Sequence, residues 1–150
     1  MNPEKESPRS YPDAPRVGAG AVVIHQNNVL LVLRGQPPAQ GLWAIPGGRV
    51  RLGETLAEAA RREVHEETGL SIKTGDVVYT FEKIERDKTG RVKFHYVVVD
   101  VLGFALKPDQ PLAPADDVLD AGWFSLSEAR ALPVSDTTLT LLEKVMTEND

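Results

Sequence analysis

The sequence predicts a single domain of the α/β class, in which helices cover a mixed β-sheet on both faces. Two pairs of β-like segments are each joined by a short polar turn, and three segments carry helix signals between and after them. A chain of 150 residues falls in the size range of one domain and can bury a substantial core. Residues 1–16 hold four prolines among polar residues, so we expect a disordered tail before a folded domain at 17–150.

The first β-like segments read as a hairpin followed by a short strand. Residues 17–24 and 29–34 flank a four-residue polar turn, which is typical of two antiparallel strands. Residues 42–45 form a short strand that runs into a turn at Gly47 and Gly48. Because glycine has no side chain, this turn can bring backbone atoms close to a neighbouring element.

A second hairpin is longer. It joins residues 77–86 to residues 91–104, and residues 96–102 within it are almost continuously apolar. Such a run predicts a strand covered on both faces. A proline-rich loop at residues 107–117 and a short closing strand at residues 121–124 follow.

The first helix has explicit start and stop signals. Thr55 followed by Glu58 is a capping-box pattern, and Gly69 supplies the left-handed residue that commonly ends a helix. We therefore expect a helix over residues 56–68. Its narrow stripe of small apolar side chains, Ala57, Ala60 and Val64, is expected to face the core and to turn the acidic residues away from it.

Two shorter helices are predicted near the end of the chain. Ser125 with Glu128 repeats the capping-box pattern and opens a helix that ends before Pro133. Ser135 begins the last helix, whose apolar face is expected to hold Leu139, Leu142, Val145 and Met146.

The most informative cluster is acidic. Glu63, Glu66 and Glu67 are spaced by three and four residues, which places them on one helix face, and like charges there oppose folding by roughly 0.2–0.5 kcal/mol per pair. The helix dipole also disfavours anions in the last turns. A multivalent cation bound by these oxygens would relieve both penalties. The alternative is a solvated acidic face, which is what most charge clusters are.

Composition narrows the classes of function. The net charge of −5 argues against a nonspecific nucleic-acid surface or a membrane surface, because either would favour a basic patch. The chain has no cysteine, which excludes disulfides and thiolate metal sites. It contains no apolar run of 18 residues and no signal-peptide pattern, so a cytoplasmic location is expected by default.

The residues around the acidic cluster resemble a known family. Gly48, Glu54 and residues 62–70 (REVHEETGL) match the Nudix box at every defining position, and residues 43–47 (WAIPG) resemble the usual approach to it. The resemblance implies a Nudix-type α/β/α sandwich and a metal-dependent enzyme that hydrolyses a diphosphate bond.

The resemblance also implies roles for single residues. Oxygen ligands select hard divalent ions, so Mg²⁺ is the expected cofactor, with Mn²⁺ as a substitute. Glu63 and Glu67 would be the main ligands, with Glu66 assisting and the Gly47 backbone carbonyl completing the set. Arg62 is expected to orient a glutamate, and Glu54 is expected to tie the glycine loop to the site.

The sequence does not determine which residue activates water. A box glutamate, Glu63 or Glu66, can act as the base, and so can an acid from a loop outside the box. Asp116, Asp117 and Asp120 lie in or beside the proline-rich loop and are weak candidates for the base or for substrate binding, since a polar loop explains each one equally well.

The substrate is expected to be a small nucleotide-type molecule. The length of the chain and the long second hairpin resemble short bacterial ADP-ribose pyrophosphatases, although the proline that often follows the box in that group is absent. ADP-ribose is the first candidate, and a nucleoside triphosphate that is oxidised or in excess is the second. A different class is a Nudix domain that senses a nucleotide without cleaving it. A homodimer is plausible.

Overall fold

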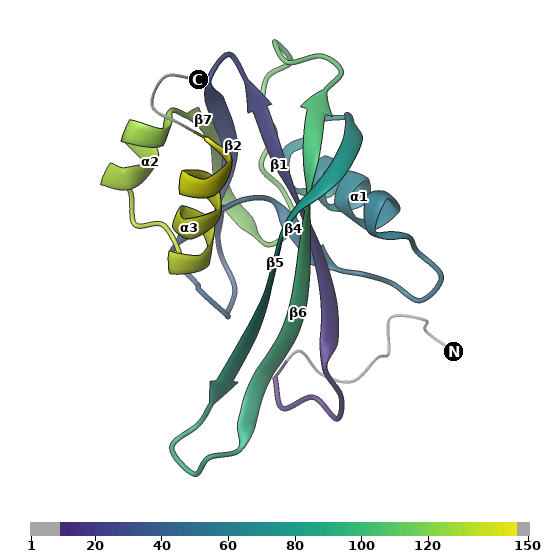
Figure 1. Cartoon of the computed structure of the whole chain (residues 1–150), viewed down its shortest axis with the longest axis vertical. Coiled ribbons are helices and arrows are strands. Elements are labelled where there is room, and N and C mark those ends of the chain that lie inside the picture. Colours follow the sequence, from purple (N-terminus) through teal and green to yellow (C-terminus); the bar gives the residue numbers. More distant parts are fainter. Residues whose placement is uncertain (1–9, 147–150) are drawn as a thin grey trace.

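A computed structural model of the chain describes residues 10–146. This part of the chain contains four strands, one helix, three further strands and two final helices, in that order (Figure 1). Their bounds are β1 Arg16–His25, β2 Asn28–Arg34, β3 Trp43–Ala44, β4 Gly47–Arg49, α1 Leu56–Thr68, β5 Ile72–Arg86, β6 Val92–Ala105, β7 Val118–Phe124, α2 Leu126–Ala131 and α3 Asp136–Val145.

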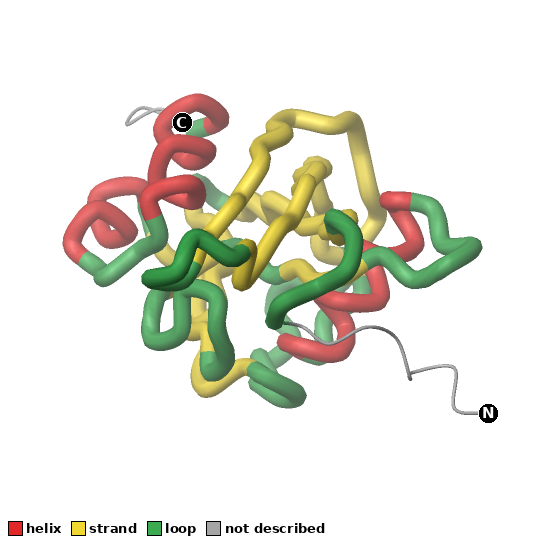
Figure 2. Tube along the Cα trace, turned by 90° about the horizontal axis from the view of Figure 1, so that it is seen from below, coloured by secondary structure: helices red, strands yellow, loops and turns green. Residues whose placement is uncertain are grey.

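The strands form one mixed sheet. Its order is β3-β2-β1-β6-β5, with β4 pairing to β1 and β7 pairing to β2. Strands β1 and β6 are parallel, whereas the other strand pairs within residues 10–146 are antiparallel. Helix α1 lies on one side of the strands, and α2 and α3 lie on the other (Figure 2). The predicted mixed sheet between helices is confirmed.

The core has two parts because side chains alternate across the central strand β1. Ala21 and Val23 pack with Val64 beneath α1, whereas Val22 on the opposite face packs with Leu141 of α3. All five side chains are at most 1% exposed. Burial of each large apolar side chain stabilises the fold by roughly 1.5–3 kcal/mol, so β1 anchors both helical layers.

The helices begin and end where the sequence predicts. The Thr55 side chain accepts a hydrogen bond from the Glu58 backbone N–H, Glu58 reciprocates, and Gly69 closes α1 with a φ of 81°. Ser125 and Glu128 form the same reciprocal pair at the start of α2, and Ser135 caps α3. None of these helices is long and apolar enough to cross a membrane.

The glycine segment after Pro46 differs from the prediction. Gly47 and Gly48 belong to strand β4, which pairs antiparallel with β1, rather than to a turn. A Cβ on Gly47 would lie 2.7 Å from the Ala19 carbonyl oxygen, so the two backbones approach more closely than a side chain allows. Glycine is depleted in strands, which is why local sequence patterns predict a turn here.

Strand β6 also differs from the prediction, because it is not covered on both faces. Val97 is 37% exposed, and the long β5–β6 hairpin extends beyond the helices (Figure 1). Asp100, the one charged residue between residues 96 and 102, is buried at 2% exposure. The hairpin therefore supplies a partly open wall instead of a closed core strand.

Residues 10–15 come from the segment that the sequence predicts to be a disordered tail. The Tyr11 hydroxyl donates to Asp87 at 2.9 Å, and the Arg91 guanidinium lies 4.3 Å from the centre of the Tyr11 ring. The Tyr11 backbone N–H also donates to the Lys93 carbonyl at 2.8 Å. This part of the segment is thus attached to the β5–β6 hairpin, while residues 1–9 lie outside the described residues.

Candidate functional site

Two of the predicted acids are buried between α1 and the sheet. Glu63 is 9% exposed and Glu67 is 6% exposed, on the same side of α1 as Val64. The expectation that α1 turns its acids away from the core is therefore wrong. The reason is Gly48 in strand β4. A Cβ on this residue would lie 2.6 Å from the Glu63 Oε1 atom, so only a glycine here leaves room for the carboxylate.

Glu67 occupies the deeper position. Its Oε1 atom accepts a hydrogen bond of 3.0 Å from the Gly47 backbone N–H. Burial, with a further contribution from the charge of Glu63, raises the pKa of Glu67 to about 8. One neutral donor does not offset the lost hydration of a buried carboxylate, so this side chain needs a cation or a proton.

Glu63 is held in place by Arg62. Burial raises the pKa of Glu63, and the hydrogen bond from Arg62 acts in the opposite direction. The Arg62 Nη1 atom lies 2.6 Å from Glu63 Oε1 and 3.3 Å from Glu66 Oε1. Glu66 is the most accessible of the three acids, with a third of its side chain exposed, and Arg51 lies 3.8 Å from it.

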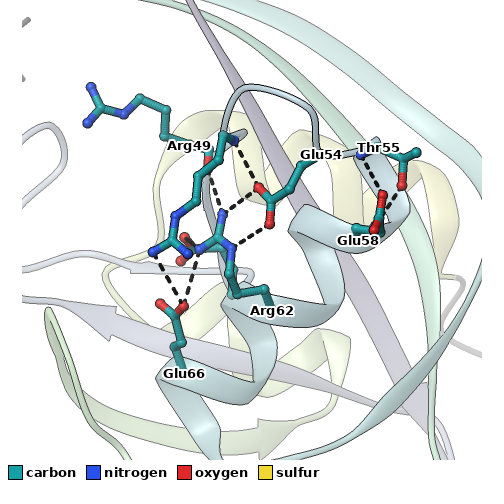
Figure 3. A network of polar contacts seen from close by, with 8 residues as sticks. Arg49, Glu54, Thr55, Glu58, Arg62 and Glu66 are labelled. Carbon is teal, nitrogen blue, oxygen red and sulfur yellow. Dashed lines mark hydrogen bonds and ion pairs between the residues drawn. The ribbon is translucent and has the colours of Figure 1, made fainter. Parts of the chain in front are cut away.

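Arg62 also braces the loop that precedes α1 (Figure 3). Its guanidinium donates to both oxygens of Glu54, at 2.6 and 2.9 Å, and to the Arg49 carbonyl at 2.9 Å. Glu54 in turn accepts from the Arg51 backbone N–H at 2.8 Å. The hydrogen bonds from Arg62 are the largest cause that lowers the pKa of Glu54 to about 2, so this pair stays charged at neutral pH.

The structure brings Glu54 and Arg62 close to the acids of α1. The carboxylates of these acids, however, contact different partners and do not converge on one point. Glu67 contacts Gly47, whereas Glu63 and Glu66 contact Arg62. No three carboxylate or imidazole side chains within residues 10–146 converge as a preformed metal site. The oxygen donors nevertheless suit a hard divalent ion, because such an ion would compensate the buried charge of Glu63 and Glu67.

These acids line a cavity of about 1010 Å³. Asp116 and Asp117, from the loop before β7, also line it, and Asp116 raises the pKa of both Glu63 and Glu67 by its charge. Asp120 is not among the residues that line the cavity, and its carboxylate accepts from the Ala121 backbone N–H at 2.8 Å.

Sequence reasoning missed a further set of residues that line the same cavity. Side chains of β5, β6 and α3 line it, and they come from segments far apart in the sequence: Phe81, Lys83, Tyr96, Val98, Asp100, Ser135, Thr137, Thr138 and Leu141. A single acid inside the apolar run at residues 96–102 was the available signal for Asp100. Arg34 was missed as well; its charge lowers the pKa of Glu67 against the effect of burial.

The chain is similar to proteins of one known family. The NUDIX domain family model matches residues 14–144. The ADP-ribose pyrophosphatase of Methanocaldococcus jannaschii is 35% identical over 113 residues, which cover 75% of this chain and 63% of that protein. The match thus spans less than two thirds of that relative's length.

Solved structures show the same fold. A MutT NUDIX hydrolase from Burkholderia pseudomallei superposes with a TM-score of 0.76 at 28% identity, covering 89% of this chain and 100% of that one. The NUDIX domain of Shewanella oneidensis NrtR, complexed with ADP ribose, gives a TM-score of 0.68 at 26% identity, covering 89% and 87%. With the family model spanning nearly the whole folded part and every box residue in place, the chain belongs to the Nudix family.

Proposed function

We propose that the protein is a divalent-metal-dependent hydrolase that cleaves the diphosphate linkage of a nucleoside diphosphate derivative, with ADP-ribose as the first candidate. One observation carries the proposal. Glu63 and Glu67 are buried against Gly47 and Gly48 of β4, where burial raises the pKa of both carboxyls despite the nearby charges of Arg62 and Arg34, in a cavity large enough for a nucleotide.

The donor chemistry fits Mg²⁺ or Mn²⁺ held by Glu63, Glu66 and Glu67, with the Gly47 carbonyl as a further ligand. A bound divalent ion would neutralise phosphate charge and lower the pKa of a coordinated water. Arg62 would keep Glu63 and Glu66 in position through the contacts that it already makes, and Glu54 would hold Arg62 in turn.

We assign the proton-accepting role to Asp116. Glu63 and Glu67 are needed as ligands, and Asp116 lines the same cavity from the opposite loop. Its backbone adopts a φ of 61°, a left-handed conformation that Asp and Asn tolerate better than most residues. Glu66, which is partly exposed beside Arg62, is the alternative base.

ADP-ribose is favoured by two of the similar proteins. The archaeal relative is named an ADP-ribose pyrophosphatase, and the NrtR domain was crystallised with ADP ribose. In the proposed reaction, a water oxygen bonds to one phosphorus while the bridging P–O bond breaks. The products are AMP and ribose 5-phosphate, and the water supplies the atoms for the two new phosphate ends.

A nucleoside triphosphate is the second candidate substrate, since the Burkholderia structure is described as a MutT hydrolase. The same acids would then release pyrophosphate and a nucleoside monophosphate. A nucleotide sensor without hydrolysis is the alternative of another class, and the full set of box acids argues against it.

The test is a panel of ADP-ribose, other nucleoside diphosphate derivatives and nucleoside triphosphates, each incubated with Mg²⁺, with Mn²⁺ and with EDTA. We expect AMP and ribose 5-phosphate from ADP-ribose, with a metal requirement, and resolve the products by chromatography. Faster release of pyrophosphate from a triphosphate would replace ADP-ribose by the second candidate. Binding of nucleotides without metal-dependent product from any of them would overturn the proposal and favour the sensor.

A further inference from the structure

Asp100 is a buried acid that the proposed hydrolysis does not use. It lies in the middle of β6 and is 2% exposed. It lines the cavity, although it is far from every box residue in the sequence. Its Oδ2 atom is buried without a hydrogen-bond partner among residues 10–146. An unpaired buried acceptor costs about 1–3 kcal/mol, so an arrangement of this kind calls for a compensating role.

The neighbouring strand makes room for this carboxylate. Gly20 of β1 pairs with Asp100 in the parallel register, and a Cβ on Gly20 would lie 2.6 Å from the Asp100 Oδ1 atom. The same Cβ would lie 3.1 Å from the Pro46 carbonyl oxygen, next to strand β4. Because residue 20 has no side chain, there is room for the Asp100 carboxyl group beside β1, where it lines the cavity.

Packing does not require an acid at this position. The adjacent residues of β6 are Val97, Val98, Val99 and Val101, and valine at residue 100 would continue the run without an unpaired polar atom. Burial raises the pKa of Asp100 to about 7, and the Oδ2 atom accepts no hydrogen bond from residues 10–146. The missing donor is thus expected to come from whatever occupies the cavity.

The surroundings define what that occupant is. Tyr96 and Val98 project from the same face of β6 as Asp100, because side chains two residues apart share a face, and Phe81 of β5 pairs beside Val98. The aromatic and apolar side chains beside the acceptor of Asp100 suit a flat heterocycle that carries an N–H group. Lys83 of β5, which pairs with Tyr96, also lines the cavity and adds one cationic group to this wall. A phosphate does not suit the position beside Asp100, because its carboxylate would repel it.

We propose that Asp100 is a specificity-determining residue that accepts a hydrogen bond from the exocyclic amino group of the substrate's nucleobase. The base then lies over β5 and β6, and the diphosphate lies at the α1 end with Glu63 and Glu67. In a base that has a carbonyl oxygen in place of the amino group, this oxygen would face the carboxylate oxygen of Asp100. Both atoms are hydrogen-bond acceptors, so such a base would bind less tightly. This inference rests on the proposed function for the presence of a nucleotide, but not on its cleavage.

The test compares two ligands that differ at this group and at the neighbouring ring nitrogen, which is an acceptor in adenine and an N–H donor in hypoxanthine. ADP-ribose carries the amino group of adenine, and its hypoxanthine counterpart, inosine diphosphate ribose, carries a carbonyl at the same carbon. Binding is measured by titration calorimetry at pH 8 with EDTA, where no hydrolysis is expected. We expect the wild-type chain to bind ADP-ribose about tenfold or more tightly than the counterpart, the scale of one hydrogen bond to a charged acceptor.

Two substitutions remove the carboxylate. Asp100→Asn keeps the shape and replaces one acceptor oxygen by an NH2 donor. Asp100→Val removes every polar atom and continues the valine run, so it serves if the first variant does not fold. Val is expected to lose the preference for ADP-ribose, and Asn, whose amide can accept from an amino group or donate to a carbonyl, is expected to bind the two ligands with similar affinity. Glu82→Gln is the matched control, because Glu82 is an exposed acid on the adjacent strand outside the cavity lining, and it should discriminate like the wild type.

The outcomes separate this inference from the proposed function. Equal affinity of the wild type for both ligands, or discrimination that persists in both Asp100 variants, would overturn the role of Asp100. No binding of either ligand, in EDTA or with Ca²⁺ present to neutralise the diphosphate, would overturn it together with the nucleotide substrate. Discrimination that depends on Asp100 in a chain that hydrolyses nothing would support Asp100 while contradicting the proposed hydrolysis.

Discussion

Single residues of the acidic cluster differ in what compensates their charge. Glu67 has one backbone donor, Glu63 shares Arg62, and Glu66 has solvent as well as Arg62 and Arg51. A change from glutamate to glutamine keeps the shape of each side chain and removes its charge. The effect of this change on turnover is therefore an electrostatic effect rather than a packing effect.

We expect Glu63→Gln, Glu66→Gln and Glu67→Gln each to lower kcat for the best substrate by about a hundredfold or more, the scale of losing a metal ligand or a base. Initial rates with saturating Mg²⁺ test this, with circular dichroism as the control for folding. If all three variants turn over at near the wild-type rate, the assignment of the site to α1 is wrong.

Asp116 is predicted to act on the chemical step rather than on binding. Asp116→Asn should lower kcat for ADP-ribose by several hundredfold while changing KM little, because losing a general base costs about 10²–10⁴-fold. Asn tolerates the left-handed backbone at this residue, so the fold should be kept. Asp120→Asn is the control and should turn over normally. Equal effects of the two substitutions would refute a specific role for Asp116.

The buried Asp100 makes stability depend on pH. Its carboxyl ionises at a higher pH in the folded chain than in the unfolded chain, so its contribution to stability is complete below pH 4 and is lost as the pH rises towards 7. Asp100→Asn should therefore become more stable relative to the wild type over this window, by at most about 4 kcal/mol. Urea unfolding of both chains in EDTA between pH 4 and pH 8 measures the difference. A difference that is constant with pH would contradict the raised pKa.

Among the elements, α1 was predicted to the residue, whereas β4 was not predicted. The capping residues Thr55 and Gly69 act within one turn of the helix that they delimit, so the sequence itself contains the signal. Strand β4 exists because it pairs with β1, a contact that no local pattern encodes. The burial of Glu63 was missed for the same reason, since it depends on the space that β4 leaves.

The close approach of α1 and β4 predicts how the metal affects stability. Millimolar Mg²⁺ or Mn²⁺ should raise the melting temperature of the wild type by binding the folded state. Gly48→Ala should reduce this rise and lower the melting temperature without metal, because its Cβ would displace the Glu63 carboxylate. Gly18→Ala is the matched control on the paired strand, where a Cβ meets only ordinary contacts of 3.5 Å. A full metal response in Gly48→Ala would argue against Glu63 as a ligand.

For the whole molecule, the order of layers was predictable and the cavity was not. Alternating apolar residues and turn signals predict a sheet between helices, and the structure confirms this arrangement. The cavity is lined by residues of all seven strands, of α1 and α3 and of the loops between them, so its shape depends on how distant segments pack. For this reason the box residues were identified from the sequence, whereas Asp100 and Ser135 were not.

The parallel pairing of β1 with β6 has a consequence for the order of folding. Arg16 pairs with Tyr96, 80 residues later in the chain, so β1 lacks its central neighbour until β6 exists. Closing a loop of this length costs entropy before any contact compensates it, which slows folding and makes it cooperative. A chain truncated after residue 91 should therefore show no cooperative thermal transition by circular dichroism, whereas the full chain shows a single one. During synthesis, the acid-bearing helix would then emerge before β5 and β6, so the sheet on which it packs would still be incomplete.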